Sequence, residues 1–384
     1  MFGNLLRQVD LADQLGFDTA WIGGAHLSLN EHQRTNTKPV LPHFRGEVCL
    51  NTDIFQLAHV LLARTNRIAI GSAIQSILAV GGPIGHAEAL LTFLTLQSQT
   101  PYHQRRLKFG FGSGRFDFVL SAFGIAPRDP AEKAAWPSIR NLIFRQAVEI
   151  FCRLAIGQSV ASNDIEPLFI SRAVVKSDEE WRKFQTLKGL STDVLELPAY
   201  WTFDKIRLVP QEINLAQADF YLGTTDLLTV AVANRYLPCR VLNLSNTATE
   251  VIETTQIAMS KIYHQSGGGW QRDFMPRTVL VFLDANKART PLQQSAYAQK
   301  RARSAMIAWQ NAMEGTISEH KLSSEMQNAI VGNPDEVASQ IKTNYHPKDR
   351  LMLWFDFNNH DSNMVENSMI EFSQYVIPRL QDID

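Results

Sequence analysis

Small and hydroxyl-bearing residues follow several short apolar runs of this sequence, and they are the residues that could bind a charged or polar ligand. Ser72-Ala73-Ile74 follows one such run, and Gly223-Thr224-Thr225 follows another. Glycine lets a ligand approach the backbone, and hydroxyls with free amides at a helix start form an anion site. Gly223-Thr224-Thr225 is therefore a candidate phosphate site at the opening of a helix. The alternative is a threonine that only caps this helix.

A third run ends in Gly110-Phe111-Gly112-Ser113-Gly114-Arg115, whose glycine spacing partly matches a dinucleotide-binding fingerprint. The match is weak, because its last position is Arg115 and no helix is predicted to open there. Ser113, Gly114 and Arg115 nevertheless follow a predicted strand and are candidates for binding a ligand.

His26 is the candidate for acid–base chemistry, because it follows a predicted strand and an imidazole titrates near neutral pH. The alternative is a histidine that only bonds the next loop. His59 and His86 fall inside predicted helices, where a structural role is expected, and the histidines show no metal-ligand spacing. The sequence contains no P-loop, HExxH or GxSxG motif. We therefore predict no metal site.

These candidates require a framework, and the chain predicts strands that alternate with helices. Each predicted strand is a short apolar run bounded by glycine or polar residues. Asn333 with Pro334 and Glu336 predicts a capped helix start. The expected strands are 19–23, 67–71, 107–111, 219–223, 240–245, 278–283 and 351–357, and the expected helices are 5–15, 54–63, 83–94, 136–154, 227–236, 251–263, 292–313 and 364–380.

Strict alternation of strand and helix predicts a parallel sheet, and about seven such units favour a closed (β/α)₈ TIM barrel over an open sheet. In such a barrel the candidates all lie at the carboxyl ends of strands, where active sites are found. The chain starts on a helix, so the first barrel strand is apparently missing. Either the sequence starts late or an extra strand is hidden in an insertion. We expect one domain, 1–384.

The stretch between the third and fourth predicted strands is longer than one helix requires. Connections longer than about 15 residues are usually functional lids or binding loops. Residues 163–203 of this stretch carry Trp181, Trp201 and several charges, and they form a candidate lid. The alternative is a surface elaboration or a dimer contact.

Composition excludes several classes of protein. The chain of 384 residues is 45% apolar and 20% charged, with a formal net charge of −1, which predicts a folded globular protein. No basic stretch favours nucleic acid or an anionic membrane as a partner. No apolar run is long enough to span a bilayer. Cys49, Cys152 and Cys239 stand far apart, and reduced thiols in a cytoplasmic protein are expected.

Eight segments of the sequence together resemble the bacterial-luciferase-like flavin-dependent monooxygenases. The resemblance spans nearly the whole chain in the family's order. Its segments are 11–23, 67–73, 107–114, 122–124, 207–211, 223–225, 331–337 and 368–380. The insertion would then follow the family's fourth strand.

The resemblance implies an FMN-dependent monooxygenase that uses reduced flavin and O₂ on a small organic substrate. It implies FMN phosphate at Ser113, Gly114, Arg115, Gly223, Thr224 and Thr225, and the flavin ring at Ser72, Ala73 and Ile74. Some members have a non-proline cis peptide bond at the position that corresponds to Ala73–Ile74. The resemblance also implies a separate NAD(P)H-dependent flavin reductase, a homodimer, and His26 as the catalytic residue.

Two departures from the family's pattern leave alternatives open. After the strand that corresponds to residues 19–23, the family often has two histidines in succession. In this sequence Ala25 stands at the position of the first histidine, and His26 at the second. Ser113 stands where many members have an arginine, and Arg115 is positioned to compensate. The alternatives are a deazaflavin F420-dependent hydride-transfer enzyme and a non-catalytic flavin-binding barrel. The substrate itself is not encoded in any recognisable motif.

Overall fold

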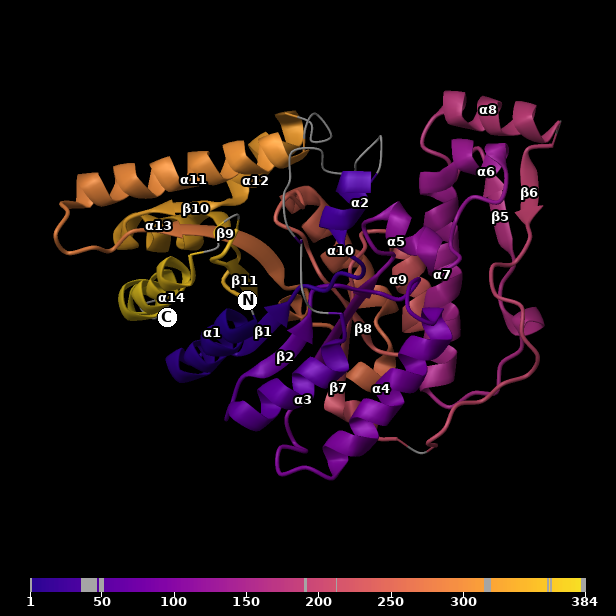
Figure 1. The fold of residues 1–384 in the computed structure, drawn as a ribbon, viewed down its shortest axis with the longest axis horizontal. Coiled ribbons are helices and arrows are strands. Elements are labelled where there is room, and N and C mark those ends of the chain that lie inside the picture. The colour runs from indigo at the N-terminus through magenta and orange to yellow at the C-terminus, as the bar shows by residue number, and fades with distance from the viewer. Residues whose placement is uncertain are drawn as a thin grey trace.

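The computed structural model describes residues 2–35, 47, 52–189, 192–211, 213–313, 319–357, 359 and 361–380. Within these residues the fold consists of two parallel sheets, helices that cover them, and a separate two-stranded antiparallel sheet. Figure 1 shows the helices arranged around the strands, with the first helix, residues 2–15, next to the helix of residues 362–371.

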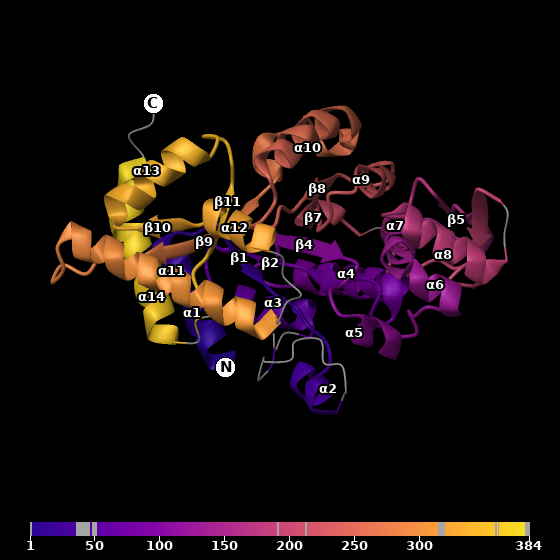
Figure 2. The ribbon, with the colours of Figure 1, turned by 90° about the horizontal axis from the view of Figure 1, so that it is seen from above.

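The larger sheet is parallel and its five main strands follow the order of the chain, β1-β2-β4-β7-β8, with the short β3 paired to β4. Figure 2 shows α3 and α4 on one side of these strands and α9 and α10 on the other. This order is the result of successive strand–helix units. The strands are β1 (Thr19–Ile22), β2 (Ala69–Ser72), β3 (Gln75–Ser76), β4 (Leu107–Gly112), β7 (Ala218–Leu222) and β8 (Cys239–Val241). The helices are α1 (Phe2–Leu15), α2 (Leu29–Thr35), α3 (Ile54–Arg64), α4 (Gly82–Ser98), α5 (Asp117–Ala122), α6 (Pro130–Ala134), α7 (Trp136–Ala155), α9 (Leu227–Asn234) and α10 (Thr249–Ile262).

The smaller sheet is also parallel, with β9 between β10 and β11. In Figure 1, α11 lies on one side of β9 and β10 and α13 and α14 lie on the other. The strands are β9 (Arg277–Leu283), β10 (Ile330–Gly332) and β11 (Leu351–Trp354). The helical segments are α11 (Pro291–Met313), α12 (Glu319–Asn328), α13 (Pro334–Asn344), α14 (Ser362–Glu371), the π-helical η5 (Phe372–Val376) and α15 (Ile377–Leu380).

The two sheets continue into one another. A parallel bridge joins Asn243, just after β8, to Arg277 at the start of β9. At the other side, β11 and β1 are connected through the Arg350–Asp18 ion pair of 2.8 Å and through Phe17 and Phe355, whose ring centroids are 6.1 Å apart. The described residues contain no ladder between β1 and β11. The strands β1, β2, β4, β7, β8, β9 and β11 thus follow one another in the order of a TIM barrel, and β3 and β10 are short additions to it.

The outward faces of the strands form the main core with the helices. Phe109 and Phe111 on β4 lie against Phe151 of α7, with ring centroids 5.7 and 5.0 Å apart. The alternate residues of β4 therefore point to the barrel interior, because successive side chains of a strand leave it on opposite faces. The interior face thus carries Lys108, Gly110 and Gly112.

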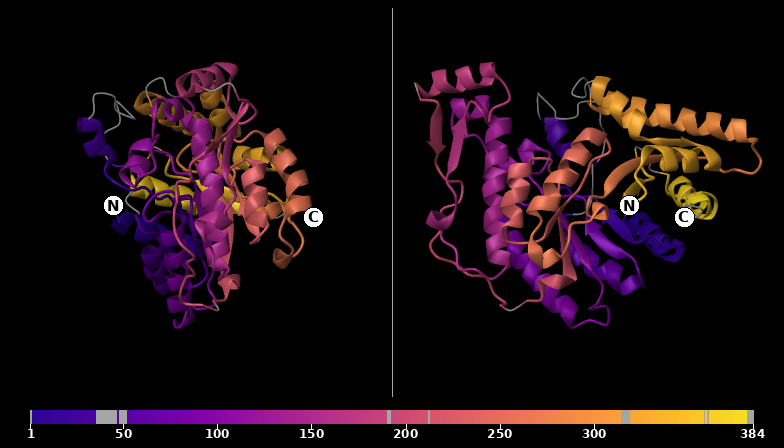
Figure 3. Two further views of the ribbon diagram at one scale, coloured as in Figure 1. Left: turned by 90° about the vertical axis from the view of Figure 1, so that its right-hand side faces the viewer. Right: turned by 180° about the vertical axis from the view of Figure 1, so that it is seen from behind.

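The insertion folds into a small unit of its own, made of η1 (Ser162–Asp164), β5 (Leu168–Ser171), α8 (Asp178–Lys188) and β6 (Val194–Leu197). Strands β5 and β6 form a two-stranded antiparallel sheet, with α8 in the connection between them. Trp181 and Phe184 are buried in the main core, with their rings stacked at 5.6 Å. Figure 3 shows this unit on the outer side of α7, away from the smaller sheet.

The expected strands and helices all have counterparts in the structure, with ends that differ by a few residues. The capping box at Asn333 and Glu336 is confirmed. Helix α5 opens at Asp117, two residues after Arg115, where the sequence predicted none. Four strands were not predicted. Strands β3 and β10 are only two and three residues long, and β5 and β6 lie in the insertion, for which no elements were predicted. Among the described helices, none combines the length and the apolar character needed to cross a bilayer.

Candidate functional site

Ile74 lies at the barrel mouth, next to the glycine-rich ends of β4 and β7. A Cβ atom added to Gly223 would lie 2.1 Å from Ile74 Cδ1, and one added to Gly112 would lie 3.2 Å from Ile74 Cγ2. The Ala73–Ile74 peptide bond is cis, as the resemblance implied. The structure therefore brings Ile74 together with Gly223, and only glycine leaves room for this contact.

Ser76 presents an unpartnered hydroxyl at the same mouth. A Cβ atom on Gly114, whose φ is +82°, would lie 2.5 Å from Ser76 Oγ. Ser76 Oγ is buried and has no hydrogen-bond partner in the described part of the chain. A buried hydroxyl without a partner costs free energy unless a ligand or water completes it. Sequence reasoning missed Ser76, although it is a polar residue within the apolar run 73–79.

The predicted phosphate-binding loop differs from its sequence-based description. Helix α9 begins at Leu227, and its N-cap is Asp226, whose carboxylate accepts hydrogen bonds from the amides of Leu228 and Thr229. Thr224 Oγ1 accepts a hydrogen bond of 3.1 Å from the Asp226 amide, so this hydroxyl holds the loop. The expectation that Gly223-Thr224-Thr225 itself opens the helix is wrong, because a carboxylate satisfies the first-turn amides.

The charge of Asp226 is balanced by Arg145, whose guanidinium lies 2.9 Å from the carboxylate. Burial by itself would raise the pKa of Asp226, but hydrogen bonds from Thr229 and Arg145 outweigh it and lower the pKa. A bound anion beside Thr225 would consequently meet a neutralised carboxylate rather than a free one.

Ser113 and Arg115 continue the mouth beyond β4. Arg115 lies over the ring of Phe116, 5.4 Å from its centroid, and burial lowers the pKa of the guanidinium below its ordinary value. The Ser113 hydroxyl makes one long contact of 3.5 Å with the Gly114 carbonyl. A hydroxyl and a partly desolvated cation close to a glycine with positive φ can accommodate an anion.

His26 lies on the other side of β3. Its Nε2 is 2.9 Å from Nε2 of Gln75, and Gln75 is buried. Gln75 and Ser76 are consecutive in β3, so their side chains leave the strand on opposite faces. His26 therefore contacts the face opposite to Ser76. Sequence reasoning missed Gln75 too, and the available signal was a glutamine within the mostly apolar stretch from Ile74 to Ala79.

The electrostatics of His26 favour the neutral ring. Burial lowers its pKa, and the Asp53 carboxylate opposes this shift in part. His86, on α4, is a helix histidine whose Nδ1 lies 2.8 Å from the Gly82 carbonyl, and burial likewise lowers its pKa. This backbone bond agrees with the structural role expected for His86. Among the described residues no group of three or more His, Cys, Asp or Glu side chains could hold a metal ion.

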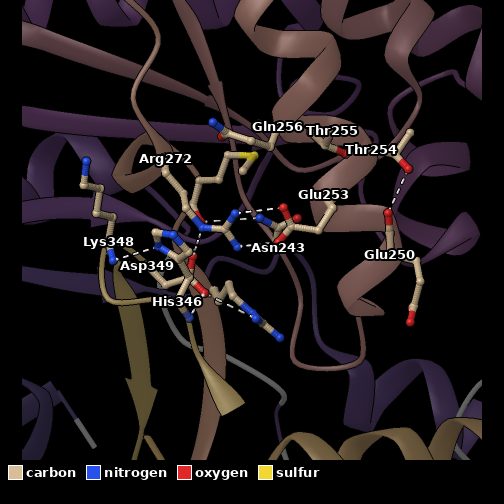
Figure 4. A network of polar contacts seen from close by, with 12 residues as sticks. Asn243, Glu250, Glu253, Thr254, Thr255, Gln256, Arg272, His346, Lys348 and Asp349 are labelled. Atoms are coloured by element: carbon tan, nitrogen blue, oxygen red, sulfur yellow. Dashed lines mark hydrogen bonds and ion pairs between the residues drawn. The ribbon is translucent and has the colours of Figure 1, made fainter. Parts of the chain in front are cut away.

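A charged cluster at the opposite end of the barrel is drawn in Figure 4. Arg272 donates to both oxygens of Glu253, at 3.0 and 2.7 Å, and to Asp349 at 2.5 Å, and Asp349 also lies 3.4 Å from Arg277. The cluster connects α10 to the chain before β9 and before β11. Its position at the amino ends of the strands indicates a stabilising role.

No protein-family model matches the sequence, and no curated protein matches it. Solved structures do match over nearly the whole chain. The monooxygenase RslO1 from Streptomyces bottropensis superposes with a TM-score of 0.63 at 16% identity, over 98% of this chain and 93% of that one. The chain has the luciferase-like barrel fold.

Two further structures with the luciferase-like fold differ in the chemistry that their names state. The long-chain alkane monooxygenase LadA superposes with a TM-score of 0.57 at 13% identity, over 99% of this chain and 83% of that one. An F420-dependent secondary alcohol dehydrogenase superposes with a TM-score of 0.56 at 14% identity, over 99% and 95%. At these identities the likeness establishes the fold, while function depends on the site itself.

Proposed function

We propose that this protein is a flavin-dependent oxidoreductase, a monooxygenase that uses reduced FMN and O₂ on a small organic substrate. The observation that carries the proposal is the buried, unpartnered hydroxyl of Ser76, next to Ile74 and the glycine-rich ends of β4 and β7. The polar edge of a flavin ring carries donors and acceptors that would complete this hydroxyl. The site lies at the carboxyl ends of the strands, where ligands of barrel enzymes bind.

The remaining candidates fit the cofactor by chemistry. Ser113, Gly114 and Arg115 with Gly223, Thr224 and Thr225 would hold the phosphate, and Ser72, Ala73 and Ile74 would contact the ring. Reduced flavin supplies the electrons for the reaction with O₂. The side chains around Ile74 exclude water from the ring, and Arg115 balances charge on the ligand. His26 would exchange a proton, which requires its ring to turn from Gln75 towards the mouth.

The same proposal includes a separate NAD(P)H-dependent reductase as the source of reduced FMN, a homodimer, and a cytoplasmic location. Residues 163–203 remain a proposed lid. Most of this insertion is fixed against α6 and α7, so the segment around Trp201 is the part that would cover the mouth. The indole Nε1 of Trp201 would be 3.0 Å from a Cβ atom on Gly82, at the start of α4.

The experiment is a titration of the protein with FMN, compared with the double variant Thr224→Val/Thr225→Val. Each hydrogen bond to a charged group contributes roughly 1.5–3 kcal/mol, so we expect the double variant to bind FMN at least tenfold more weakly. Thr254→Val is the matched control, since the Thr254 hydroxyl bonds the Glu250 carbonyl within α10. Unchanged FMN affinity in the double variant would contradict the phosphate assignment.

The second candidate is hydride transfer with F420, favoured by the fold shared with an F420-dependent alcohol dehydrogenase. Oxygen consumption with reduced FMN supports the monooxygenase. Bleaching of F420 absorbance with an alcohol substrate supports the dehydrogenase instead. Flavin binding without either activity supports a non-catalytic flavin-binding barrel, a possibility to which Ala25 at the family's first histidine position points.

A further inference from the structure

Trp354 ends the last strand of the barrel on its inner face. Leu351 and Leu353 of β11 line a cavity of about 320 Å³ together with Ile341 and Phe372, which belong to the outer helical layer. Alternate residues of a strand point to opposite faces, so Trp354 does not point to this layer. Because the strands are parallel, the carboxyl end of β11 lies at the same rim as Ile74 and Ser76.

Two further aromatic rings support Trp354. The Trp354 and Phe357 rings meet edge to face, with centroids 5.1 Å apart and planes at 81°. Phe357 meets Trp309 of α11 in the same manner, at 5.6 Å and 70°. Phe357 is 7% exposed, whereas Trp354 is 41% exposed. The buried Phe357 ring thus fixes Trp354 in place, and a large part of the indole is exposed at the rim.

A cluster of buried apolar side chains lies behind these rings. Leu280 and Phe282 on the inner face of β9 are buried with Met306 of α11 and with Phe357. The polar candidates Ser76, Ser113 and Arg115 come from the larger sheet instead. The mouth therefore has one polar side and one aromatic side, which is the arrangement of pockets that hold small organic ligands.

We propose that Trp354, supported by Phe357 and Trp309, is the substrate-contacting wall of this site and that it takes a planar aromatic compound with one polar substituent. This inference rests on the proposed function, because it assigns a substrate class to the same mouth. A rigid indole that is exposed on one side offers a flat apolar surface, which a planar ring covers more completely than a puckered one.

The test uses two probes with the same carbon skeleton, 2-naphthol and its fully saturated counterpart decahydro-2-naphthol, titrated calorimetrically into the flavin-free protein. We expect 2-naphthol to bind more tightly. Trp354→Ala should weaken its binding about tenfold or more, the range of a central aromatic contact. Trp354→Phe should retain most of the affinity, because it keeps a flat aromatic surface at this position. A urea unfolding midpoint of Trp354→Ala close to that of the unmodified protein shows that its loss of binding is not a loss of folding.

Ile307→Ala is the matched control. Ile307 is exposed on α11 and lines a groove of about 340 Å³ between α11 and α12, and Trp354 does not line this groove. Equal binding of both probes, or unchanged 2-naphthol binding in Trp354→Ala, overturns the proposal. A loss in Ile307→Ala as large as that in Trp354→Ala also overturns it, because the probe would then occupy the groove. FMN titration of the same variants tests the proposed function independently.

Discussion

Gln75 is positioned to set the protonation and orientation of His26. In the structure its Nε2 lies 2.9 Å from His26 Nε2, while Gln75 Oε1 is buried without a partner in the described part of the chain. A neutral amide that donates to the ring nitrogen favours the unprotonated ring, in the same direction as burial. The side chain is thus a positioning residue for the candidate acid–base group.

Replacing Gln75 by glutamate should reverse this effect. A carboxylate within hydrogen-bond distance stabilises the imidazolium, so we expect Gln75→Glu to raise the pKa of His26 by about one unit or more. The measurement is a pH titration of the His26 ring nitrogens by NMR, with Gln75→Leu as the control that removes the amide without adding charge. A His26 pKa that is the same in Gln75→Glu as in the unmodified protein would show that the two side chains are not in contact.

At the scale of elements, β1 and β2 depend on a contact between a large ring and a glycine. A Cβ atom on Gly71 would lie 2.5 Å from Trp21 Cε3, and Trp21 is also in edge-to-face contact with Tyr221 of β7 at 5.1 Å. Trp21 and Gly71 are register partners in the parallel ladder. The indole therefore fills the barrel interior in the space that a side chain at residue 71 would need.

We expect Gly71→Ala to lower the free energy of unfolding by roughly 1–3 kcal/mol, the usual cost of overpacking. In the background of Trp21→Leu the same substitution should cost much less, because the clashing ring is gone. Urea denaturation of the two single variants and the double variant measures this coupling. Gly3→Ala is the control, since a Cβ there meets nothing within 4 Å. Additive effects at residues 21 and 71 would contradict the contact.

At the scale of the whole molecule, burial of neutral histidines couples stability to pH. Burial lowers the pKa values of His26, His59 and His86 below the ordinary value of 6.5. The unfolded chain therefore binds more protons than the folded protein once the pH falls below about 7. Stability from these groups is complete above the unfolded pKa and is lost as the pH falls towards the folded values.

We accordingly expect the urea midpoint to fall between about pH 7.5 and pH 5.5. His59→Phe should reduce this fall. The ring centroids of His59 and Phe93 are 4.5 Å apart, and the buried His59 Nε2 has no hydrogen-bond partner among the described residues. A phenylalanine ring can therefore take the same place without a titrating group. The measurement compares the urea midpoint of His59→Phe with that of the unmodified protein at each pH. An identical fall in the variant and the unmodified protein would mean that His59 does not contribute.

The sequence by itself determined the order and type of the main elements. Apolar spacing, Pro83 in the first turn of α4 and the capping box at Asn333 act within a few residues of the chain, so they can be recognised without any tertiary information. The same holds for the placement of the candidates after strands, which the parallel order of the sheet confirms. The predicted N1 position of Pro83 is off by one residue, because α4 begins at Gly82.

Only the tertiary structure decided which of these residues meet. Thr225 and Arg115 were predictable as loop residues, but Gln75 and Ser76 form a strand only because β3 pairs with β4. The grouping of Trp309, Trp354 and Phe357 likewise needs β11 and α11 in place. Such contacts join residues far apart in the chain, and their distances are set by the packing of whole elements, which no local pattern encodes.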